Sequence, residues 1–273
     1  MLNLFGESVG TIRLDKLTDE DMLRHIASLQ ALGLAPRTIS NHFNRISTML
    51  RLHGIKDILR KEDRPKYDEK EPDAYTREEL TALFQVADAE ERLLFTFFLQ
   101  TGFREREVMF CTWRDVDFDG QVIKVRAKRN MGFRIKDCEE RSVPVPDSLL
   151  AALKERRHVS TSILVFPGRD GKPDGHYLRR LKRLALESQI NCGQCIDKQG
   201  RSCAVHPVCQ GAILHEFRRT FATMHHEAGV SARTIQLFLG HASLDVTLRY
   251  LAGADLRSDR IREQVNGTFS AVA

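Results

Sequence analysis

The most informative segments of the chain are residues 215–229, HEFRRTFATMHHEAG, and residues 238–251, FLGHASLDVTLRYL. Each contains an amphipathic helical pattern that stops at a glycine, Gly229 in the first stretch and Gly240 in the second. After Gly240 the helical pattern resumes as a short helix that runs into Tyr250. The two stretches therefore predict that the C-terminal part of the chain is a series of closely packed helices.

The same helical spacing extends upstream, interrupted by one region with strand character. Thr76 and Glu79 form a capping box that opens a helix, and Gly102 ends the strongly apolar helix that follows. Further along, two strands bracket a long polar and basic hairpin. We expect helices at residues 90–100, 148–156, 177–188, 215–226 and 232–239, and strands at residues 122–125 and 141–145. The fold class is therefore α+β, mainly α with a small antiparallel β-sheet.

A smaller helical segment precedes this α+β part of the chain. Helical patterns cover residues 18–32, with Thr18 as the N-cap, and residues 36–52. The sequence KEDRPKYDEKEPD that follows is dense in charge, contains two prolines and shows no apolar periodicity, so it is interpreted as a linker. We expect a helical domain at residues 1–60, the linker at 61–73 and the larger domain at 74–273.

The composition is that of an ordinary globular protein, because 42% of the residues are hydrophobic and 29% are charged. A net charge of +5 is compatible with a nucleic-acid partner but too small to identify one. The first ten residues do not resemble a signal peptide, and the longest apolar run, residues 93–99, is too short to span a bilayer. These features predict a soluble, cytoplasmic protein without a membrane partner.

Four short motifs carry side chains suited to chemistry on a phosphate: TGFR at residues 101–104, HEFR at 215–218, LGH at 239–241 and TLRY at 247–250. Singly, each has an ordinary explanation, because arginines after turns usually form surface ion pairs and most tyrosines are packing residues. Together and in this order, the motifs resemble the active-site boxes of the tyrosine recombinase (phage integrase) family. The resemblance covers the chain from about Thr76 to its end. Less specifically, residues 4–59 are similar to the family's core-binding domain.

This resemblance implies a helical SAM-like core-binding domain followed by a tyrosine-recombinase catalytic domain, and it implies roles for individual side chains. Tyr250 would be the nucleophile that attacks a DNA phosphate. Arg104 and Arg218 would bind the non-bridging phosphate oxygens, which paired guanidinium donors match well. His215 and His241 would donate hydrogen bonds to the phosphate or move the proton of the tyrosine.

Two further roles follow from the same resemblance. Glu107 is similar to the acidic residue that braces Arg104 in the family. The acid that protonates the leaving 5′-oxygen would be a lysine of the hairpin VRAKRNMGFRIKDCEERSVPVP, at residues 125–146. Lys136, five residues before the RSVPVP segment, resembles the spacing of the family best, and Lys128 is the alternative.

A protein of this family would act on double-stranded DNA that carries a specific recombination site, without ATP and with no cofactor for catalysis. It would form a 3′-phosphotyrosyl intermediate and exchange strands through a Holliday junction as a homotetramer on DNA, with accessory DNA-bending proteins as further partners. A helix at about residues 254–265 would then pack on a neighbouring protomer.

Two alternatives remain open at the level of sequence. A nicking-closing topoisomerase uses the same chemistry, but the short chain and the LGH box disfavour it. A catalytically silent DNA-binding accessory protein with the same fold is the second alternative, because the segment that resembles the core-binding domain begins almost at residue 1 and looks N-terminally short. The intact set of Arg104, His215, Arg218, His241 and Tyr250 argues against this loss of activity.

One face of the helix expected at residues 36–52 is a candidate DNA-binding surface. Arg37, Asn41 and Arg45 are four residues apart and therefore lie on one side of the helix, away from its apolar stripe. In isolation such a face is usually just solvated. Within a core-binding domain its two arginines become candidates for phosphate contacts.

The loop at residues 191–211 is rich in cysteine. Cys192, Cys195, Cys203 and Cys209 lie within eighteen residues, with His206 among them. This knuckle-like spacing is typical of a structural zinc site, formed by the four sulfurs or with His206 in place of one of them. The bland alternative is four unrelated reduced thiols. A metal here would fix the chain just before His215.

Overall fold

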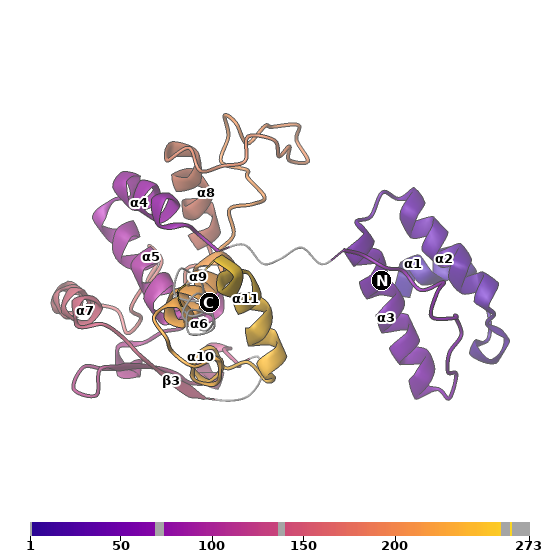
Figure 1. Cartoon of the computed structure of the whole chain (residues 1–273), viewed down its shortest axis with the longest axis horizontal. Coiled ribbons are helices and arrows are strands. Elements are labelled where there is room, and N and C mark those ends of the chain that lie inside the picture. Colours follow the sequence, from indigo (N-terminus) through magenta and orange to yellow (C-terminus); the bar gives the residue numbers. More distant parts are fainter. Residues whose placement is uncertain (1, 69–73, 136–139, 258–262, 264–273) are drawn as a thin grey trace, which may run out of the picture. The chain divides into compact units, whose positions relative to one another are not determined.

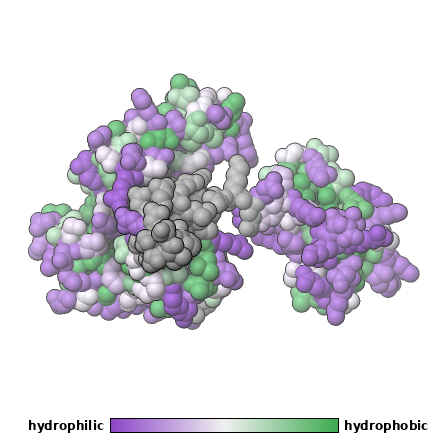
Figure 2. All heavy atoms as spheres, in the orientation of Figure 1, coloured by the Kyte–Doolittle hydropathy of each residue, from purple (hydrophilic) through white to green (hydrophobic). Residues whose placement is uncertain are grey.

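The computed structural model describes residues 2–68, 74–135, 140–257 and 263, and for residues 252–257 it describes the backbone only. By its contacts the chain divides into two compact units, Met1–Lys70 and Glu71–Ala273 (Figure 1). Hydrophilic and hydrophobic residues are intermixed on the face of each unit that Figure 2 shows. No helix within the described ranges combines the length and apolarity needed to cross a membrane.

The first unit is helical, and its elements are α1 (Leu2–Val9), α2 (Asp19–Ala31) and α3 (Pro36–Leu52). A capping box begins α2, because the side chains of Thr18 and Asp21 each accept the backbone N–H of the other. The apolar stripes of the helices meet in a core of Met22, Ile26, Leu29, Ile39, Phe43, Ile46, Leu50 and Leu59. Arg64 donates two hydrogen bonds to the carbonyl of Leu59, which fastens the chain beyond residue 60 to this unit.

The second unit is mainly helical and carries a small sheet. Its helices are α4 (Arg77–Val86), α5 (Ala89–Thr101), α6 (Glu105–Met109), α7 (Asp147–Val159), α8 (Tyr177–Glu187), α9 (His215–Glu227), α10 (Ala232–Leu239) and α11 (Leu244–Arg257). The strands β1 (Val116–Asp117), β2 (Val122–Val125) and β3 (Arg141–Pro144) form an antiparallel sheet in the order β1-β2-β3. Ile123 of β2 lies opposite Val116 on one side and Val143 on the other, and all three side chains are buried. This row of side chains joins the sheet to the core.

The centre of the second unit is the contact between α5 and α9. Phe95 of α5 stacks on Phe217 of α9 with ring centroids 5.5 Å apart, and both rings are fully buried. Further along α9, Phe221 closes the space at the end of α5, because a Cβ on Gly102 would lie 2.8 Å from its Cδ1. Gly102 also has φ +60°, a left-handed conformation that favours glycine. Residue 102 must therefore be glycine for the chain to turn from α5 towards Arg104.

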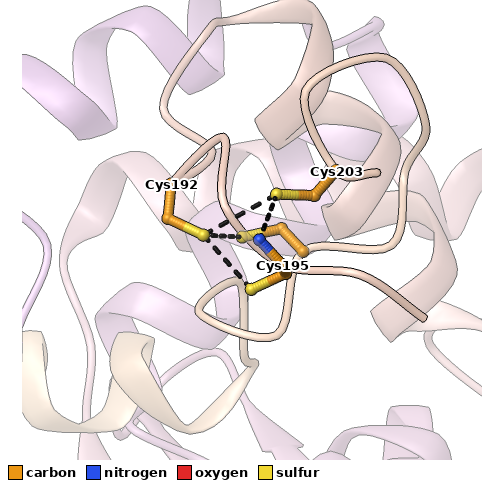
Figure 3. A group of neighbouring side chains, drawn as sticks. Cys192, Cys195 and Cys203 are labelled. Atoms are coloured by element: carbon orange, nitrogen blue, oxygen red, sulfur yellow. Dashed lines mark hydrogen bonds between the residues drawn. The ribbon is translucent and has the colours of Figure 1, made fainter. Parts of the chain in front are cut away.

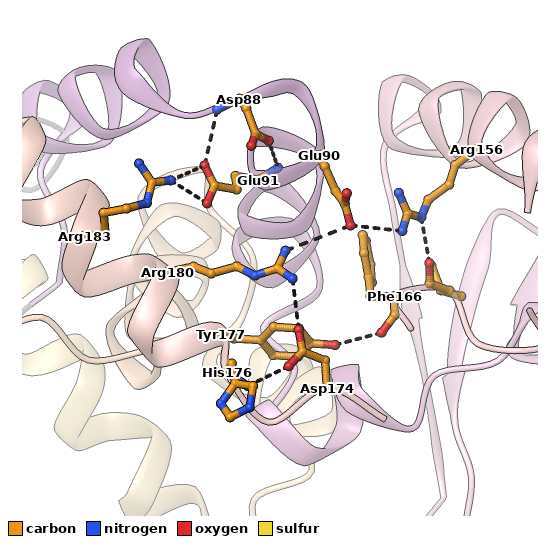
Figure 4. A network of polar contacts seen from close by, with 11 residues as sticks. Asp88, Glu90, Glu91, Arg156, Phe166, Asp174, His176, Tyr177, Arg180 and Arg183 are labelled. Atoms are coloured by element: carbon orange, nitrogen blue, oxygen red, sulfur yellow. Dashed lines mark hydrogen bonds and ion pairs between the residues drawn. The ribbon is translucent and has the colours of Figure 1, made fainter. Parts of the chain in front are cut away.

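Ion pairs tie the first turn of α5 to α7 and α8 (Figure 4). Arg183 of α8 donates to both carboxylate oxygens of Glu91, at 2.6 and 2.5 Å. Glu90 lies within ion-pair distance of Arg156 of α7 and of Arg180 of α8. Three helices from distant parts of the sequence are thus held together by charged contacts as well as by apolar packing.

Most of the expected elements are confirmed, and α3 and α10 begin and end at the predicted residues. The prediction at the C-terminal end is wrong in one respect: α11 continues through Tyr250 to Arg257, so no separate helix begins at about residue 254. A single glycine, Gly253, costs a helix about 1 kcal/mol and is not enough to end it. Beyond Arg257, most of the segment expected to pack on a neighbour lies outside the described residues. The short elements α1, α6 and β1 are not indicated by the sequence, because apolar periodicity needs a longer window.

Candidate functional site

The four motifs converge in the second unit because the elements that carry them meet there. Helix α9, which begins at His215, packs against α5, α10 and α11. The TGFR motif follows α5, the LGH motif follows α10, and Tyr250 lies on α11. Side chains that are far apart in the sequence are therefore neighbours in the fold.

Arg104 lies at the start of α6 and is held by Glu107. The backbone N–H of Arg104 donates to Oε2 of Glu107 at 2.8 Å, and its Nη1 donates to Oε1 at 3.1 Å. The side chain of Glu107 is 3% exposed, whereas that of Arg104 is 22% exposed. The carboxylate thus supports the guanidinium from the protein interior, which is the contact that a bracing role requires.

Arg218 is buried between the ends of two helices. Its Nη1 donates to the carbonyl of Gly102 at 2.7 Å, and its Nη2 donates to the carbonyl of Leu239. A cation suits these positions, because helix C-termini carry partial negative charge. Burial, and then the charge of Arg104, lower the pKa of Arg218 to about 9, so it remains a cation at neutral pH. Within the described part of the chain, its Nε has no hydrogen-bond partner.

His241 follows the glycine that ends α10. Its Nδ1 shares a hydrogen bond of 2.9 Å with Oγ1 of Thr247, and its carbonyl accepts the side-chain amide of Gln236 at 2.9 Å. Burial first, and then the charges of Arg218 and Arg104, lower the pKa of His241 to about 3. The ring is therefore neutral at physiological pH and acts as a hydrogen-bonding group, not as a cation.

Tyr250 lies between the two histidines. Its hydroxyl is 2.7 Å from Nε2 of His215, and its ring meets that of His241 edge-on with centroids 5.2 Å apart. The other described phenols of this unit, Tyr75 and Tyr177, have pKa values raised by burial. Among the described tyrosines of the second unit, Tyr250 is thus the one placed next to an imidazole base.

A cavity of about 250 Å³ opens beside these residues. It is lined by Phe103, Arg104, Glu105, Leu178, Ile213, Leu214 and His215. Two of the polar groups expected to bind a phosphate, Arg104 and His215, therefore face one hollow.

The two lysine candidates differ in what the structure describes. Nζ of Lys128 lies 2.8 Å from a carboxylate oxygen of Asp115 and 3.1 Å from the carbonyl of Arg126, and the side chain is 12% exposed. Its ammonium group also lies 5.6 Å from the ring centroid of Phe133. Lys136 lies outside the described residues. The choice between the two lysines stays a prediction.

The four cysteines of the loop between α8 and α9 form one cluster, and dashed lines in Figure 3 join the sulfur of Cys192 to those of its neighbours. The sulfurs of Cys192, Cys195, Cys203 and Cys209 all lie within 4.8 Å of one another. Those of Cys195, Cys203 and Cys209 are 3.2, 3.7 and 3.6 Å from that of Cys192. A disulfide needs about 2.0 Å between sulfurs, and a tetrahedral zinc with Zn–S bonds of about 2.3 Å separates them by about 3.8 Å. The spacing fits a metal, and His206 is not part of the cluster.

Backbone amides support these sulfurs. The N–H of Cys195 donates to the sulfur of Cys203 at 3.2 Å, and the N–H of Gln210 donates to that of Cys195 at 3.4 Å. The N–H of Gln194 and the thiol of Cys195 lower the pKa of Cys192 to about 6, whereas burial raises the pKa of Cys203 to about 11. Donors aimed at sulfur favour the thiolates that a metal needs.

In the first unit, Arg37, Asn41 and Arg45 are exposed on α3, while Ile39, Phe43 and Ile46 fill its buried side. The guanidinium of Arg37 lies 5.5 Å from the ring centroid of Tyr67. The sequence pattern therefore located the solvent face correctly. Exposure alone does not assign a ligand to it.

Arg141 is a residue of the site for which the sequence suggested no role. It begins β3 and donates to both carboxylate oxygens of Glu107, at 3.0 and 2.6 Å. The signal in the sequence is weak, because an arginine at the start of a strand is usually a surface residue. Only the fold shows that β3 runs next to the end of α10.

Known proteins resemble this chain in sequence and in fold. The profile of the phage integrase family matches residues 74–257. A related protein, the tyrosine recombinase XerA of Pyrococcus furiosus, is 27% identical over 266 residues, which cover 91% of this chain and 85% of the relative.

Solved structures share the fold. The Tn1549 transposon integrase in complex with transposon right end DNA superposes with a TM-score of 0.71 at 18% identity, covering 97% of this chain and 90% of that one. The XerH site-specific recombinase in a post-cleavage complex with a palindromic difH substrate gives 0.66 at 18% identity, covering 97% and 77%. The matched profile spans more than half of the sequence, and the chain belongs to the phage integrase family of tyrosine recombinases.

Proposed function

We propose that this protein is a site-specific DNA recombinase or integrase that cleaves DNA through a 3′-phosphotyrosyl intermediate. The observation that carries the proposal is the 2.7 Å contact between the Tyr250 hydroxyl and the Nε2 of His215 beside two arginines. A phenol has a pKa of about 10, so it attacks phosphorus only when a base and nearby cations favour the phenolate.

In the proposed cleavage step, the Tyr250 oxygen forms a bond to phosphorus while the bond to the 5′-oxygen breaks. His215 accepts the phenolic proton, and a lysine of the 125–146 hairpin, Lys136 or Lys128, donates a proton to the 5′-oxygen. Attack by the 5′-hydroxyl of another strand reverses the step and releases Tyr250. Each cleavage conserves one phosphoester bond, so no ATP is required.

The remaining groups would stabilise charge on the phosphate. Arg104 faces the cavity, and the buried Nε of Arg218 is a donor that a phosphate oxygen would satisfy. His241, neutral at physiological pH, would add a hydrogen bond without adding charge. The arginines therefore supply the positive charge that metal-dependent enzymes obtain from an ion.

Double-stranded DNA with a specific recombination site is the proposed substrate. The Tn1549 integrase and XerH structures that share this fold contain DNA, and Arg37, Asn41 and Arg45 offer an exposed polar face in the first unit. Strand exchange between two duplexes requires four cuts, which favours four protomers and a Holliday junction. Accessory DNA-bending proteins would act on that assembly.

The cysteine cluster is proposed to hold one structural zinc ion through Cys192, Cys195, Cys203 and Cys209. Four thiolates form a closed tetrahedral site without a free position for substrate, so the ion would stabilise the fold. Cys203 and Cys209 pack with Ala185 of α8 and with Ala212, three residues before His215. The metal would thus fix the start of α9.

A suicide DNA substrate, nicked so that the cleaved end diffuses away, tests the proposed function directly. The purified protein is expected to form a covalent adduct that survives denaturation in SDS. A protein that binds duplex DNA specifically but forms no adduct with any permuted half-site would instead be the silent DNA-binding protein with the same fold.

A further inference from the structure

The side chain of Arg141 is fully hydrogen bonded within the protein, because all three of its nitrogens donate to protein acceptors. Nη1 and Nη2 donate to the two oxygens of Glu107, and Nε donates to the carbonyl of Phe238 at 2.7 Å. The side chain is only 6% exposed. Arg141 is therefore not placed to bind a phosphate, although it lies beside the residues that are.

The packing around Arg141 connects two parts of the site. Its guanidinium lies 5.5 Å from the ring centroid of Phe103, the neighbour of Arg104. On the other side, a Cβ on Gly240 would lie 3.0 Å from Cδ of Arg141, and Gly240 has φ +61°. The glycine before His241 thus both ends α10 and makes room for this side chain.

Glu107 is shared between two guanidinium groups. Arg141 makes two hydrogen bonds to it, and Arg104 makes one through its side chain. Burial acts to raise the pKa of Glu107, but the hydrogen bonds and charge of Arg141 hold it below its usual range. The carboxylate is therefore ionised, and its single negative charge faces two positive ones.

We propose that Arg141 is a positioning residue, which neutralises Glu107 and so leaves the charge of Arg104 available for the scissile phosphate. The inference rests on the proposed function. With Arg141 in place, the bidentate pair with Glu107 is neutral as a unit, and Arg104 remains a net cation. Without Arg141, the buried carboxylate would take its compensating charge from Arg104, and the Arg104–Glu107 pair would attract a phosphate weakly.

The test compares Arg141→Gln with the double variant Arg141→Gln/Glu107→Gln in single-turnover cleavage of a suicide substrate at saturating DNA. Residues in contact couple strongly, so the single variant is expected to cleave about 10- to 100-fold more slowly than wild type. The double variant should recover part of that loss, because a neutral amide no longer competes for Arg104. A double variant that is slower than the single one would overturn the proposal.

A methylphosphonate at the scissile position gives a second readout, because its reacting group has one negative charge fewer. The penalty of Arg141→Gln on the cleavage rate is expected to be at least tenfold smaller on this substrate than on phosphate, and a tenfold change corresponds to about 1.4 kcal/mol. A purely structural role would reduce both rates equally, and equal penalties would refute the charge effect. Arg141→Lys, which keeps the charge but not the fork, should lie between wild type and Arg141→Gln on phosphate.

Arg183→Gln is the matched control, because Arg183 also binds both oxygens of a buried carboxylate, Glu91, on the scaffold of the same unit. It is expected to lower the melting temperature and leave the cleavage rate of the folded protein unchanged on both substrates.

If Arg141→Gln does not fold, Arg141→Lys and the double variant carry the same comparison. Absence of any adduct with the wild-type protein would refute the proposed function itself, whereas a normal wild-type rate with unaffected Arg141 variants would refute only this inference.

Discussion

The hydroxyl of Tyr250 and the Nε2 of His215 lie 2.7 Å apart, within a hydrogen bond, although 34 residues separate them in the chain. The contact exists because α11 packs on α9 and directs the phenol back to the first residue of that helix. In the proposed function, the nucleophile is therefore already hydrogen bonded to its base before the substrate phosphate binds.

Tyr250→Phe is expected to abolish the covalent adduct while changing the dissociation constant for DNA less than about threefold, since the phenol oxygen contributes little beside the arginines. Adducts on a suicide substrate and gel mobility shifts measure the two effects. Tyr177→Phe is the control: it removes a phenol that donates to the carbonyl of Phe166, and should lower stability without preventing the adduct. An adduct formed by Tyr250→Phe would exclude Tyr250 as the nucleophile.

The buried, neutral state of His241 predicts a pH dependence of stability. Its pKa is about 3 in the folded protein, below the ordinary value of about 6.5. Between these values the unfolded chain binds a proton that the folded chain does not. The stabilising contribution is therefore complete above pH 6.5 and is lost as the pH falls towards 3.

His241→Asn should accordingly flatten the dependence of the unfolding free energy on pH by up to about 1.4 kcal/mol per pH unit between pH 6.5 and 4. Denaturant titrations at several pH values measure this slope. His158→Asn, which changes an exposed histidine on α7, is the control and should leave the slope as in wild type. The same slope in His241→Asn and wild type would show that His241 is not the buried neutral group described here.

The general acid can be identified with a substrate whose leaving group needs no proton. Lys136→Ala is expected to slow cleavage by about 10²- to 10⁴-fold, and a substrate with a 5′-bridging sulfur should restore the rate because its leaving group needs no proton. Lys124→Ala is the control, because Lys124 lies on β2, just before the 125–146 hairpin, and pairs with Asp117 of β1. If Lys128→Ala alone shows the loss and the rescue, Lys128 is the acid and must leave Asp115 to act.

Local signals in the sequence were enough to predict most helices. Thr18 and Thr76 both form the capping boxes that their spacing indicates, and Gly102 and Gly240 both end helices in the left-handed conformation. Such features depend on neighbours within four residues, so a single sequence reveals them.

Features that depend on tertiary contacts could not be predicted. Arg141 meets Glu107 and the carbonyl of Phe238 only because β3 runs beside α10, and no spacing rule links residues 34 and 97 positions apart. The depressed pKa of His241 likewise arises from burial and from arginines on other elements. The end of the last helix was misjudged because a single glycine, Gly253, costs a helix only about 1 kcal/mol and does not end α11.

DNA affinity should fall steeply with salt if the exposed face of α3 contacts phosphates. Each lost contact reduces the slope of log K against log salt by about 0.9, so Arg37→Ala/Arg45→Ala is expected to reduce it by about 1.8. Fluorescence anisotropy at several salt concentrations measures the slope. Arg13→Ala/Arg24→Ala removes two arginines of the same unit that pair with Asp15 and Asp21, and should change the slope less. Equal slopes in wild type and in the α3 variant would leave that face without a role in DNA binding.

The cysteine cluster makes a prediction that separates stability from catalysis. The purified protein should contain about one zinc ion per chain, which a thiol-reactive mercurial releases and elemental analysis measures. Removal of the ion should lower the melting temperature, because metal-binding energy is part of the folding energy, yet the fraction that stays folded should cleave at the normal rate. Cys203→Ser should reproduce this loss of metal and stability, whereas Cys111→Ser, at a buried cysteine outside the cluster, should retain the zinc. Protein purified under reducing conditions without zinc would refute the site, and loss of cleavage in EDTA with an intact circular dichroism spectrum would mean that a metal takes part in the chemistry.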